Sequence, residues 1–295
     1  NHPTSRSFTL SPQDSNVYGP APATVAESNG ISITYDPNSK TWTIRNFNKM
    51  SHIDFIAKAT GTISEFETIG FNRFKAAGID SLLLQQKDGF MEKTLVGEAG
   101  AHTSCYFVVT GDFDNDMDMD LYLTCTGPVA NLPNRLLEND GKGNFMIVPG
   151  AGGATGSQLG RGDVVATADY DGDGFIDLFV TNGHDPTSPL TENGPHQLFR
   201  NQGNENHWLE IELEGVKSNR DGIGARVELE TDDGIIQIRE QTGGMHRIAQ
   251  NHQRLHFGLG SHGQVKQLKV TWPSGIIQNL KSIEADQILH ISESH

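Results

Sequence analysis

The sequence predicts an all-β protein in which three propeller-type repeats of four strands each, an incomplete or open propeller, precede a small β-sandwich or barrel domain. Its 33 glycines, 12 prolines, 35% hydrophobic residues and mean hydropathy of -0.44 suit many short strands and tight turns. A motif recurs along the first two thirds of the chain, and apolar and polar residues alternate in the last third. For 295 residues we expect two domains.

The N-terminal part predicts an arm followed by a hairpin. Residues 1–30 are rich in Pro, Ser, Thr and Asn and show neither a helical nor a strand period, so we expect an extended arm. Residues 31–35 and 41–44 alternate apolar with polar side chains around the turn-forming residues 36–40. This pattern predicts a β-hairpin.

An internal repeat follows the hairpin. Its clearest copies are GDFDNDMDMDLYLT from Gly111 and ADYDGDGFIDLFVT from Ala168, and a degenerate copy, RNFNKMSHIDFIAK, begins at Arg45 and keeps only one acid, Asp54, in register. Each copy is followed by a strand that ends in a Gly turn. Four short strands per copy match a β-propeller blade, so we assign residues 31–205 to three such repeats.

The pattern changes after Trp208. Alternating segments separated by Gly turns predict strands at residues 209–213, 225–230, 235–239, 265–272 and 288–291. We therefore expect residues 206–295 to form a compact β-sandwich or barrel.

The two clear copies carry the spacing of a calcium loop. Calcium takes about six to eight oxygen ligands, and a loop can supply them from alternate residues. In the second loop, residues 169–177 and hereafter loop 2, acids stand at positions 1, 3, 5 and 9, and the carbonyl at position 7 completes the set: Asp169, Asp171, Asp173, Phe175 and Asp177. Gly174 at position 6 permits the sharp turn, and strand residues follow in place of the helix of an EF-hand.

The first loop, residues 112–120 and hereafter loop 1, repeats the layout with Asp112, Asp114, Asp116, Asp118 (through its carbonyl) and Asp120. Met117 replaces the turn glycine, and a left-handed conformation costs a non-glycine residue about 1–2 kcal/mol. We therefore expect calcium at both loops, with weaker binding at loop 1. The degenerate upstream copy has a single carboxylate, and we assign it no metal.

Both loops, with the DLYLT and DLFVT that follow them, resemble the FG-GAP/VCBS repeats of integrin-α-type β-propellers. The segments NRDGIGARVELE, IREQTGG, HFGLG and VKQLKVTWPSG resemble the ASPIC/UnbV domain that follows such repeats in cartilage acidic protein-like proteins. The resemblance covers about residues 43–293. It implies calcium-binding hairpins and an extracellular location, and no agreed chemistry for the C-terminal domain.

Cys105 and Cys125 are the only cysteines, and their number alone does not separate a disulfide from two buried thiols. They lie on the strands that run into and out of loop 1, nearly opposite across a hairpin, so we expect a disulfide. Two buried reduced thiols remain the alternative.

Composition and motifs exclude several classes of function. Lys and Arg total 22 against 37 Asp and Glu, a formal net charge of -15, which argues against nucleic acid as a partner. No apolar run approaches the roughly 20 residues of a membrane-spanning helix. We find no nucleophile elbow, zincin His pair or phosphate loop, and we expect no enzyme. His246, His252 and His256 are expected to be surface or turn residues.

The function expected from the sequence is that of a secreted calcium-binding structural or adhesive protein. Three repeats cannot close a propeller ring, so open strand edges favour self-association into an oligomer or filament. The alternatives are a piece of a longer chain with more blades, and an open edge covered by the C-terminal domain. Two other functions remain in competition: a calcium-dependent lectin that stacks sugars on aromatic faces such as Trp208, with glycans or cell-surface proteins as partners, and an enzyme with an unrecognised site.

Overall fold

A computed structural model of the chain describes residues 10–14, 31–46, 81–94, 105–126, 131–183, 194–246 and 248–295. The regular elements there are β-strands and one short 3₁₀ turn at Pro149–Gly153, which confirms the all-β class. The chain divides into two compact units, one of Asn1–Asn72 with Thr187–Pro189 and one of Arg73–Pro186 with Leu190–His295. The degenerate Asp motif from Asn48 to Asp54 and most of the N-terminal arm lie outside the described residues.

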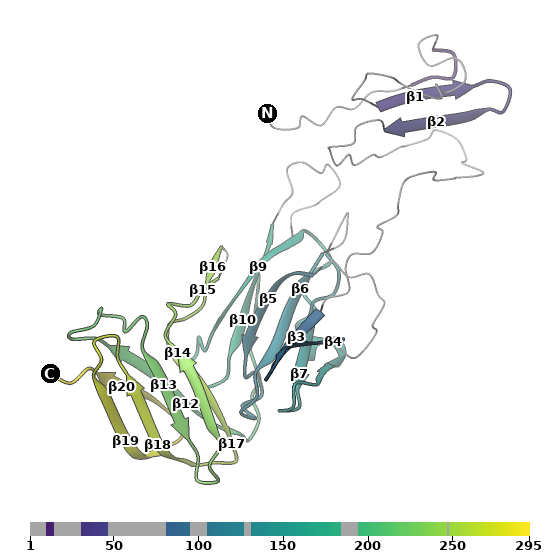
Figure 1. Cartoon of the computed structure of the whole chain (residues 1–295). Helices are drawn as coiled ribbons and strands as arrows, with labels where there is room; N and C mark the ends of the chain where they lie inside the picture. Colours follow the sequence, from purple (N-terminus) through teal and green to yellow (C-terminus); the bar gives the residue numbers. More distant parts are fainter. Residues whose placement is uncertain are drawn as a thin grey trace. The chain divides into compact units, whose positions relative to one another are not determined.

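In the first unit the predicted hairpin is present (Figure 1). Strands β1 (Ile31–Asp36) and β2 (Thr41–Asn46) pair antiparallel, with Asp36 opposite Thr41. The Asp36 carboxylate accepts hydrogen bonds from the backbone N–H of Asn38 at 2.9 Å and the hydroxyl of Ser39 at 3.0 Å. This side chain closes the turn, as the cluster of turn-forming residues predicts.

The repeat region predicted for residues 31–205 continues in the second unit (Figure 1), and the strands of the first predicted repeat form two separate two-stranded sheets, β1–β2 in the first unit and the next hairpin in the second, instead of one four-stranded sheet. A hairpin of β3 (Ser81–Gln86) and β4 (Gly89–Thr94) comes first. A four-stranded antiparallel sheet follows, formed by β5 (Cys105–Gly111), β6 (Asp120–Cys125), β7 (Arg135–Asn139) and β8 (Phe145–Ile147). Next is a three-stranded sheet of β9 (Arg161–Ala168), β10 (Asp177–Gly183) and β11 (Gln197–Phe199). Loop 1 joins β5 to β6, and loop 2 joins β9 to β10.

The last repeat has three strands in its sheet instead of the expected four. The strand that follows β11, β12 (His207–Glu214), pairs with strands of the C-terminal domain. Its side chains Leu209 and Ile211 are fully buried in the core of that domain. Strand β12 therefore belongs to a sheet of the C-terminal domain instead of completing the last repeat.

The two repeat sheets share a core. Along β5 the buried Phe107 and Val109 alternate with the exposed Tyr106 and Val108, so one face of the sheet is covered. The covered face packs against the buried side chains of the next sheet, among them Val164, Val165, Leu178 and Val180.

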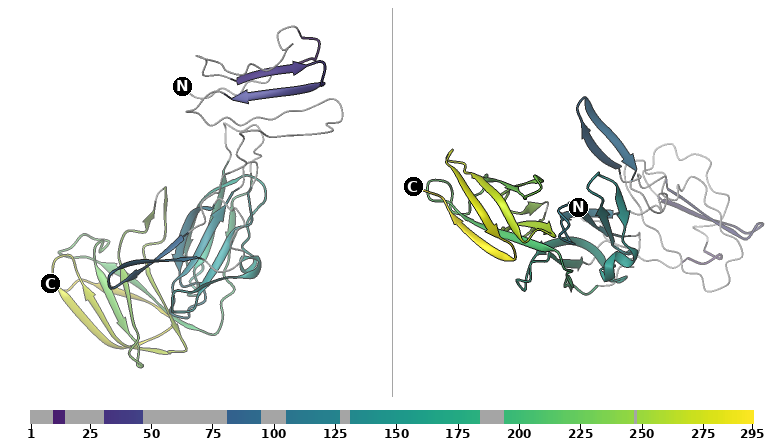
Figure 2. Two further views of the ribbon diagram at one scale, coloured as in Figure 1. Left: turned by 45° about the vertical axis from the view of Figure 1, so that its right-hand side comes forward. Right: turned by 90° about the horizontal axis from the view of Figure 1, so that it is seen from below.

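The C-terminal domain is a two-sheet structure, as predicted (Figure 2). One sheet has the order β17 (Leu255–Gly260), β12, β20 (Gln287–Ser292), and the other β14 (Ile236–Glu240), β13 (Arg226–Glu230), β18 (Gln264–Thr271), β19 (Ile277–Glu284). A two-residue pair, β15 (Met245–His246) and β16 (Ala249–Gln250), precedes β17. Fifteen buried apolar residues, including Phe257 and Trp272, form one core.

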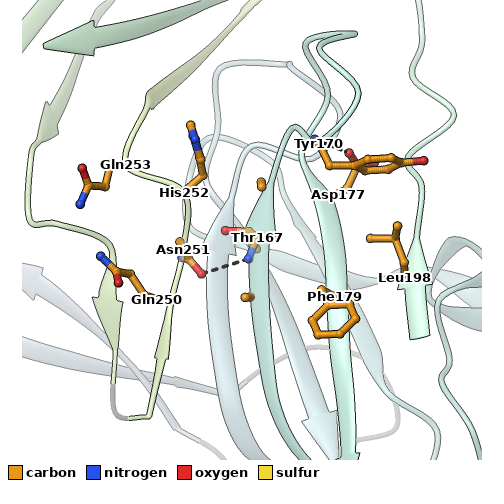
Figure 3. A pocket seen from close by; sticks show the side chains of 11 residues that line it. Thr167, Tyr170, Asp177, Phe179, Leu198, Gln250, Asn251, His252 and Gln253 are labelled. Carbon is orange, nitrogen blue, oxygen red and sulfur yellow. Dashed lines mark hydrogen bonds between the residues drawn. The ribbon is translucent and has the colours of Figure 1, made fainter. Parts of the chain in front are cut away.

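The C-terminal domain also covers the free edge of β9 (Figure 3). The backbone N–H of Thr167 donates to the Asn251 side-chain carbonyl at 3.0 Å, and the His252 N–H donates to the Thr167 carbonyl, also at 3.0 Å. At Thr167 the C-terminal domain therefore covers an open edge of the repeats within one chain, which is one of the alternatives to self-association considered from the sequence. Among the described residues no helix has the length and apolarity needed to cross a bilayer.

Candidate metal centre

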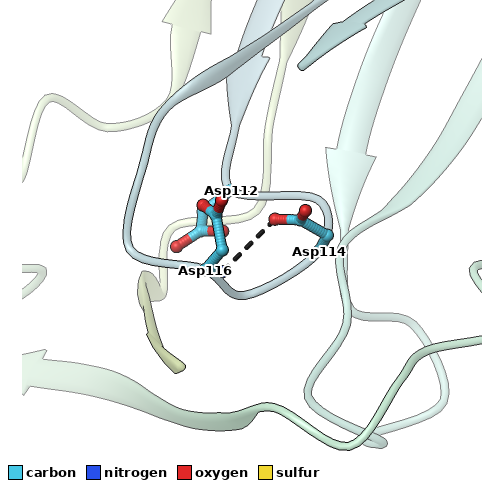
Figure 4. A group of neighbouring side chains, drawn as sticks. All are labelled: Asp112, Asp114 and Asp116. Atoms are coloured by element: carbon cyan, nitrogen blue, oxygen red, sulfur yellow. Dashed lines mark hydrogen bonds between the residues drawn. The ribbon is translucent and has the colours of Figure 1, made fainter. Parts of the chain in front are cut away.

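Loop 1 folds back on itself through its own carboxylates. The Asp112 carboxylate accepts from the Met117 N–H at 3.0 Å, Asp114 accepts from the Asp116 N–H at 3.2 Å, and Asp116 accepts from the Asp118 N–H at 2.9 Å. Met117 adopts a positive φ of 83°, as expected for a residue in the place of Gly174. The folded loop gathers Asp112, Asp114 and Asp116, which each offer one carboxylate oxygen within 4.8 Å of the others (Figure 4).

This cluster carries buried negative charge with little compensation. Asp112 is 1% exposed, and its Oδ1 has no hydrogen-bond partner. Burial, together with the neighbouring carboxylates of Asp116, Asp120 and Asp114, raises the pKa of Asp112 to about 8, against a lowering by Arg239. Burial likewise raises the pKa of Asp114 to about 6 and that of Asp120 to about 7.

Asp120, at the ninth position, has a different role from the first three acids. Its two carboxylate oxygens accept backbone hydrogen bonds, from Phe113 at 3.0 Å and from Asn139 at 2.9 Å. Asp120 therefore closes the loop and ties it to the end of β7. Asp118 also lies outside the cluster of three, and its carboxylate stands against Gly141.

Loop 2 has the same frame in a more open setting. Asp169 accepts N–H groups from Gly172, Asp173 and Gly174 at 2.8–3.1 Å, and Asp173 accepts from Phe175. Three side chains offer oxygens within 4.8 Å of one another: Asp169, Asp171 and Asp177.

Here a cation from the chain already faces the carboxylates. The Arg200 guanidinium bonds to Asp171 and, at 2.9 Å, to Asp173. Phe175, predicted to give a carbonyl ligand, buries its ring beside Gly203. Burial raises the pKa of the Asp177 carboxyl above its ordinary value.

Two asparagines outside the predicted ligand sets, Asn139 and Asn201, each close one of the loops. The N–H of Asn201 donates to Asp177 at 2.7 Å, just as the N–H of Asn139 donates to Asp120. Each Asn occupies the same place in the Gly-turn strand that follows its Asp motif, in LLEND and LFRNQ. Because the two asparagines occupy the same place in both repeats, the sequence alone could have indicated that they belong to the loops.

The donor set fits calcium. Both clusters consist of carboxylates alone, which are the hard oxygen ligands that calcium takes. The buried Oδ1 of Asp112 has no hydrogen-bond partner, and a bound cation would compensate it. The residues that would hold the ion are Asp112, Asp114 and Asp116 in loop 1 and Asp169, Asp171 and Asp177 in loop 2.

The three histidines form no metal group within the described part of the chain. His256 differs from the surface or turn residue expected, because it lies on β17 and bonds to the Gly174 carbonyl at 3.0 Å. Burial lowers its pKa to about 4. His246 bonds to the Asn251 side chain at 2.9 Å.

The predicted disulfide is present between Cys105 and Cys125. The two residues lie opposite each other at the ends of β5 and β6, with their Cα atoms 3.8 Å apart. The cross-link therefore joins the two strands that lead into and out of loop 1.

Comparisons with known proteins agree with these two parts of the fold. Residues 112–180 match the family model of the FG-GAP-like repeat, from the first acid of loop 1 into β10, and residues 215–295 match that of ASPIC and UnbV. The chain is therefore similar to the FG-GAP-like repeat in its middle part and to ASPIC and UnbV in its C-terminal part.

Curated relatives contain the same kind of sequence. The chain is 31% identical to cartilage acidic protein 1 of Xenopus tropicalis over 194 residues and to that of Homo sapiens over 192, which is 64% and 62% of this chain. Those stretches are 29% and 27% of the relatives. The chain therefore spans less than a third of the length of the curated relatives it matches.

Proposed function

We propose that this chain is a calcium-binding structural module of an extracellular protein, in which one ion at each Asp loop holds the FG-GAP-like repeats together. The observation that carries the proposal is the Asp112 carboxylate, which is 1% exposed, has an unpartnered oxygen and lies among other carboxylates. A divalent cation would compensate this charge.

A structural role is supported over a catalytic one by the burial of the site. Asp112 is 1% exposed and Asp114 and Asp116 are only partly exposed, so an ion in loop 1 would be partly enclosed by the loop. The disulfide beside loop 1 is typical of oxidising, extracellular compartments. The similarity to proteins named for cartilage points to the same location.

Thermal unfolding tests the proposal. A ligand present at about 100 times its Kd stabilises the folded state by about 2.7 kcal/mol, so millimolar calcium should raise the Tm by several degrees over the protein in EGTA. Magnesium at the same concentration, and the exposed-site control Asp232→Asn, distinguish a specific effect from ionic strength. An equal Tm in calcium and in EGTA contradicts the proposal.

We also propose that the chain associates with further copies of itself through the edges of its sheets. Part of the edge of β9 is covered, whereas other end strands of the described sheets, such as β8, β11, β14 and β19, could pair with another chain. Light scattering in millimolar calcium should then give a mass above 32.2 kDa. A monodisperse monomer would contradict self-association without contradicting the proposed calcium binding.

A cleft beside loop 2 favours glycan binding as a second candidate function. The cleft holds about 540 Å³ and is lined by exposed Tyr170 and Phe179 on the repeat side and by Gln250 and Gln253 on the other (Figure 3). Aromatic faces with amide groups suit sugars. Trp208, the aromatic residue named from the sequence, is 8% exposed and packs on Gly174, so it does not offer a stacking face. Binding on a glycan array that Phe179→Ala abolishes would support this function, and an array without signal would reject it.

A further inference from the structure

Loop 1 is seated directly on the ASPIC and UnbV domain. The N–H of Gly260, at the end of β17, donates to the Asn115 carbonyl at 2.7 Å. Two residues earlier, Gly258 lies so close to the loop that a Cβ there would stand 2.1 Å from the Asp112 Oδ2 and 2.5 Å from the Asn115 Cα. Only a glycine fits between β17 and loop 1.

Loop 2 is seated on the same domain. The Cα of Gly174 faces the Trp208 indole of β12, and a Cβ there would stand 1.9 Å from the ring. His256 of β17 donates its Nε2–H to the Gly174 carbonyl at 3.0 Å, because a carbonyl can only accept. Strand β17 therefore contacts both loops, and β12 contacts loop 2.

The two loops are also joined to each other. The Asn115 side-chain amide, at position 4 of loop 1, donates to the same Gly174 carbonyl at 3.1 Å. The Asn201 amide donates to the Phe113 carbonyl of loop 1 at 2.7 Å and contacts the Ile176 carbonyl of loop 2 at 3.3 Å. A change in the path of either loop therefore reaches the other through shared acceptors.

The negative charge of loop 1, where β17 contacts it, requires a compensating cation. Arg239, whose guanidinium carbon lies 5.1 Å from the centre of the Phe257 ring, is a cation of the C-terminal domain that attracts the Asp112 carboxylate electrostatically. It faces a loop with five aspartates, and it already donates to the carbonyls of His256 and Ile238 and to the Gln237 side chain. One guanidinium does not neutralise that loop, so without a metal the carboxylates oppose the seating of β17 on it.

We infer that the ASPIC and UnbV domain is part of the calcium site: Gly258, His256 and Asn115 position the two loops, so that ion binding at either loop and seating of this domain are one linked equilibrium. The inference rests on the proposed calcium function and adds a positioning partner to it. None of the three residues contributes to the carboxylate clusters. The C-terminal domain has a core of its own, separate from the core that the two repeat sheets share.

Linkage is reciprocal, and this gives the test. If calcium favours the seated state, a change that disfavours seating must weaken calcium binding by the same factor, typically about 5- to 150-fold. Gly258→Ala places a methyl group against loop 1 and alters no carboxylate. Gly263→Ala is the matched control, because a Cβ there meets only the His207 ring, at 3.9 Å.

The experiment is calcium titration calorimetry on the full chain, with hydrogen exchange at the Gly260 amide as a second measurement. We expect Gly258→Ala to weaken calcium binding at least about 10-fold and Gly263→Ala to stay within about 2-fold of the parent. The Gly260 amide should exchange slowly in calcium and rapidly in EGTA. Parent-like affinity of Gly258→Ala overturns the inference while calcium binding by the parent upholds the proposed function. A parent chain that binds no calcium overturns both.

A second variant keeps the test valid if Gly258→Ala fails to fold. Asn115→Gly retains the positive φ of 59° and removes only the amide that reaches Gly174. Glycine already occupies the matching position of loop 2, at Gly172 with φ of 76°. We expect the two calcium ions to bind cooperatively to the parent and independently to this variant. Equal cooperativity in both overturns the coupling of the loops.

Discussion

Loops 1 and 2 have the same spacing of acids and the same hydrogen-bonded frame, yet they differ in how their charge is compensated. Loop 1 keeps Asp112 buried with an unpartnered oxygen, and burial and neighbouring acids raise the pKa of that carboxyl to about 8. Loop 2 is more exposed, and Arg200 bonds to two of its acids. Identical ligand spacing therefore does not give identical sites, because the residues packed around a loop decide its need for a cation.

The largest expected effect on stability comes from a substitution in the turn of loop 2. Gly174→Ala would place a Cβ 1.9 Å from Trp208 at a φ of 86°, so we expect it to lower the free energy of unfolding by about 3–5 kcal/mol. Gly172→Ala is the matched control, since it has a φ of 76° and open space around it, and we expect it to cost about 1–2 kcal/mol. Urea denaturation of both variants measures the difference, and equal costs would show that the Trp208 contact is unimportant.

Neutralising the buried acid of loop 1 should separate stability from binding. In metal-free protein at pH 8, Asp112→Asn removes a carboxylate whose raised pKa disfavours the folded state as it ionises, so we expect a gain of about 1–3 kcal/mol. The same variant should lose calcium binding at loop 1. Asp171→Asn, which removes an acid already paired with Arg200, should not stabilise the metal-free protein. A destabilised Asp112→Asn in EGTA would argue that the charge of loop 1 is compensated.

The competing cation of loop 2 gives a smaller effect. Calcium must displace Arg200 from Asp171 and Asp173, so Arg200→Gln should tighten calcium binding at loop 2 by about 2- to 5-fold. Arg220→Gln, another exposed arginine, should leave the affinity unchanged. Calorimetric titration decides, and a weaker affinity in Arg200→Gln would mean that the guanidinium supports the site.

The smallest effect concerns the turn of loop 1. Met117 holds a φ of 83°, so Met117→Gly should stabilise the metal-free protein by up to about 1 kcal/mol despite the lost side-chain contacts. Met119→Gly, at a residue without a positive φ, should destabilise it. A loss of more than about 1 kcal/mol in Met117→Gly would show that packing of its side chain near Gly260 outweighs the strain.

Features that depend on neighbours in the chain could be predicted from the sequence. The alternate acids, the left-handed Met117, the hairpin at residues 31–46 and the Cys105–Cys125 pair each follow from short-range spacing and from antiparallel pairing across one turn. The C-terminal sandwich followed from alternation, although β17 and β19 were not predicted. Much of β19 is exposed, which weakens its alternation as a signal.

Features that depend on contacts between distant segments could not be predicted. His256 meets Gly174 across 82 residues, and the fit of Gly258 against Asp112 exists only after both domains have folded. Trp208 looked like an exposed sugar platform because no local pattern shows that a glycine of loop 2 lies beneath it. The same reason explains why Arg200 was not recognised as the partner of loop 2.

Counting bound ions tests most directly whether each Asp loop binds one calcium ion. Equilibrium dialysis of the metal-free chain against radioactive calcium in excess of magnesium gives the stoichiometry without reference to stability. We expect two ions per parent chain, one in Asp112→Asn, one in Asp169→Asn and none in the double variant, because each loop supplies one carboxylate cluster. No bound calcium on the parent chain, or two ions on the double variant, would contradict this expectation.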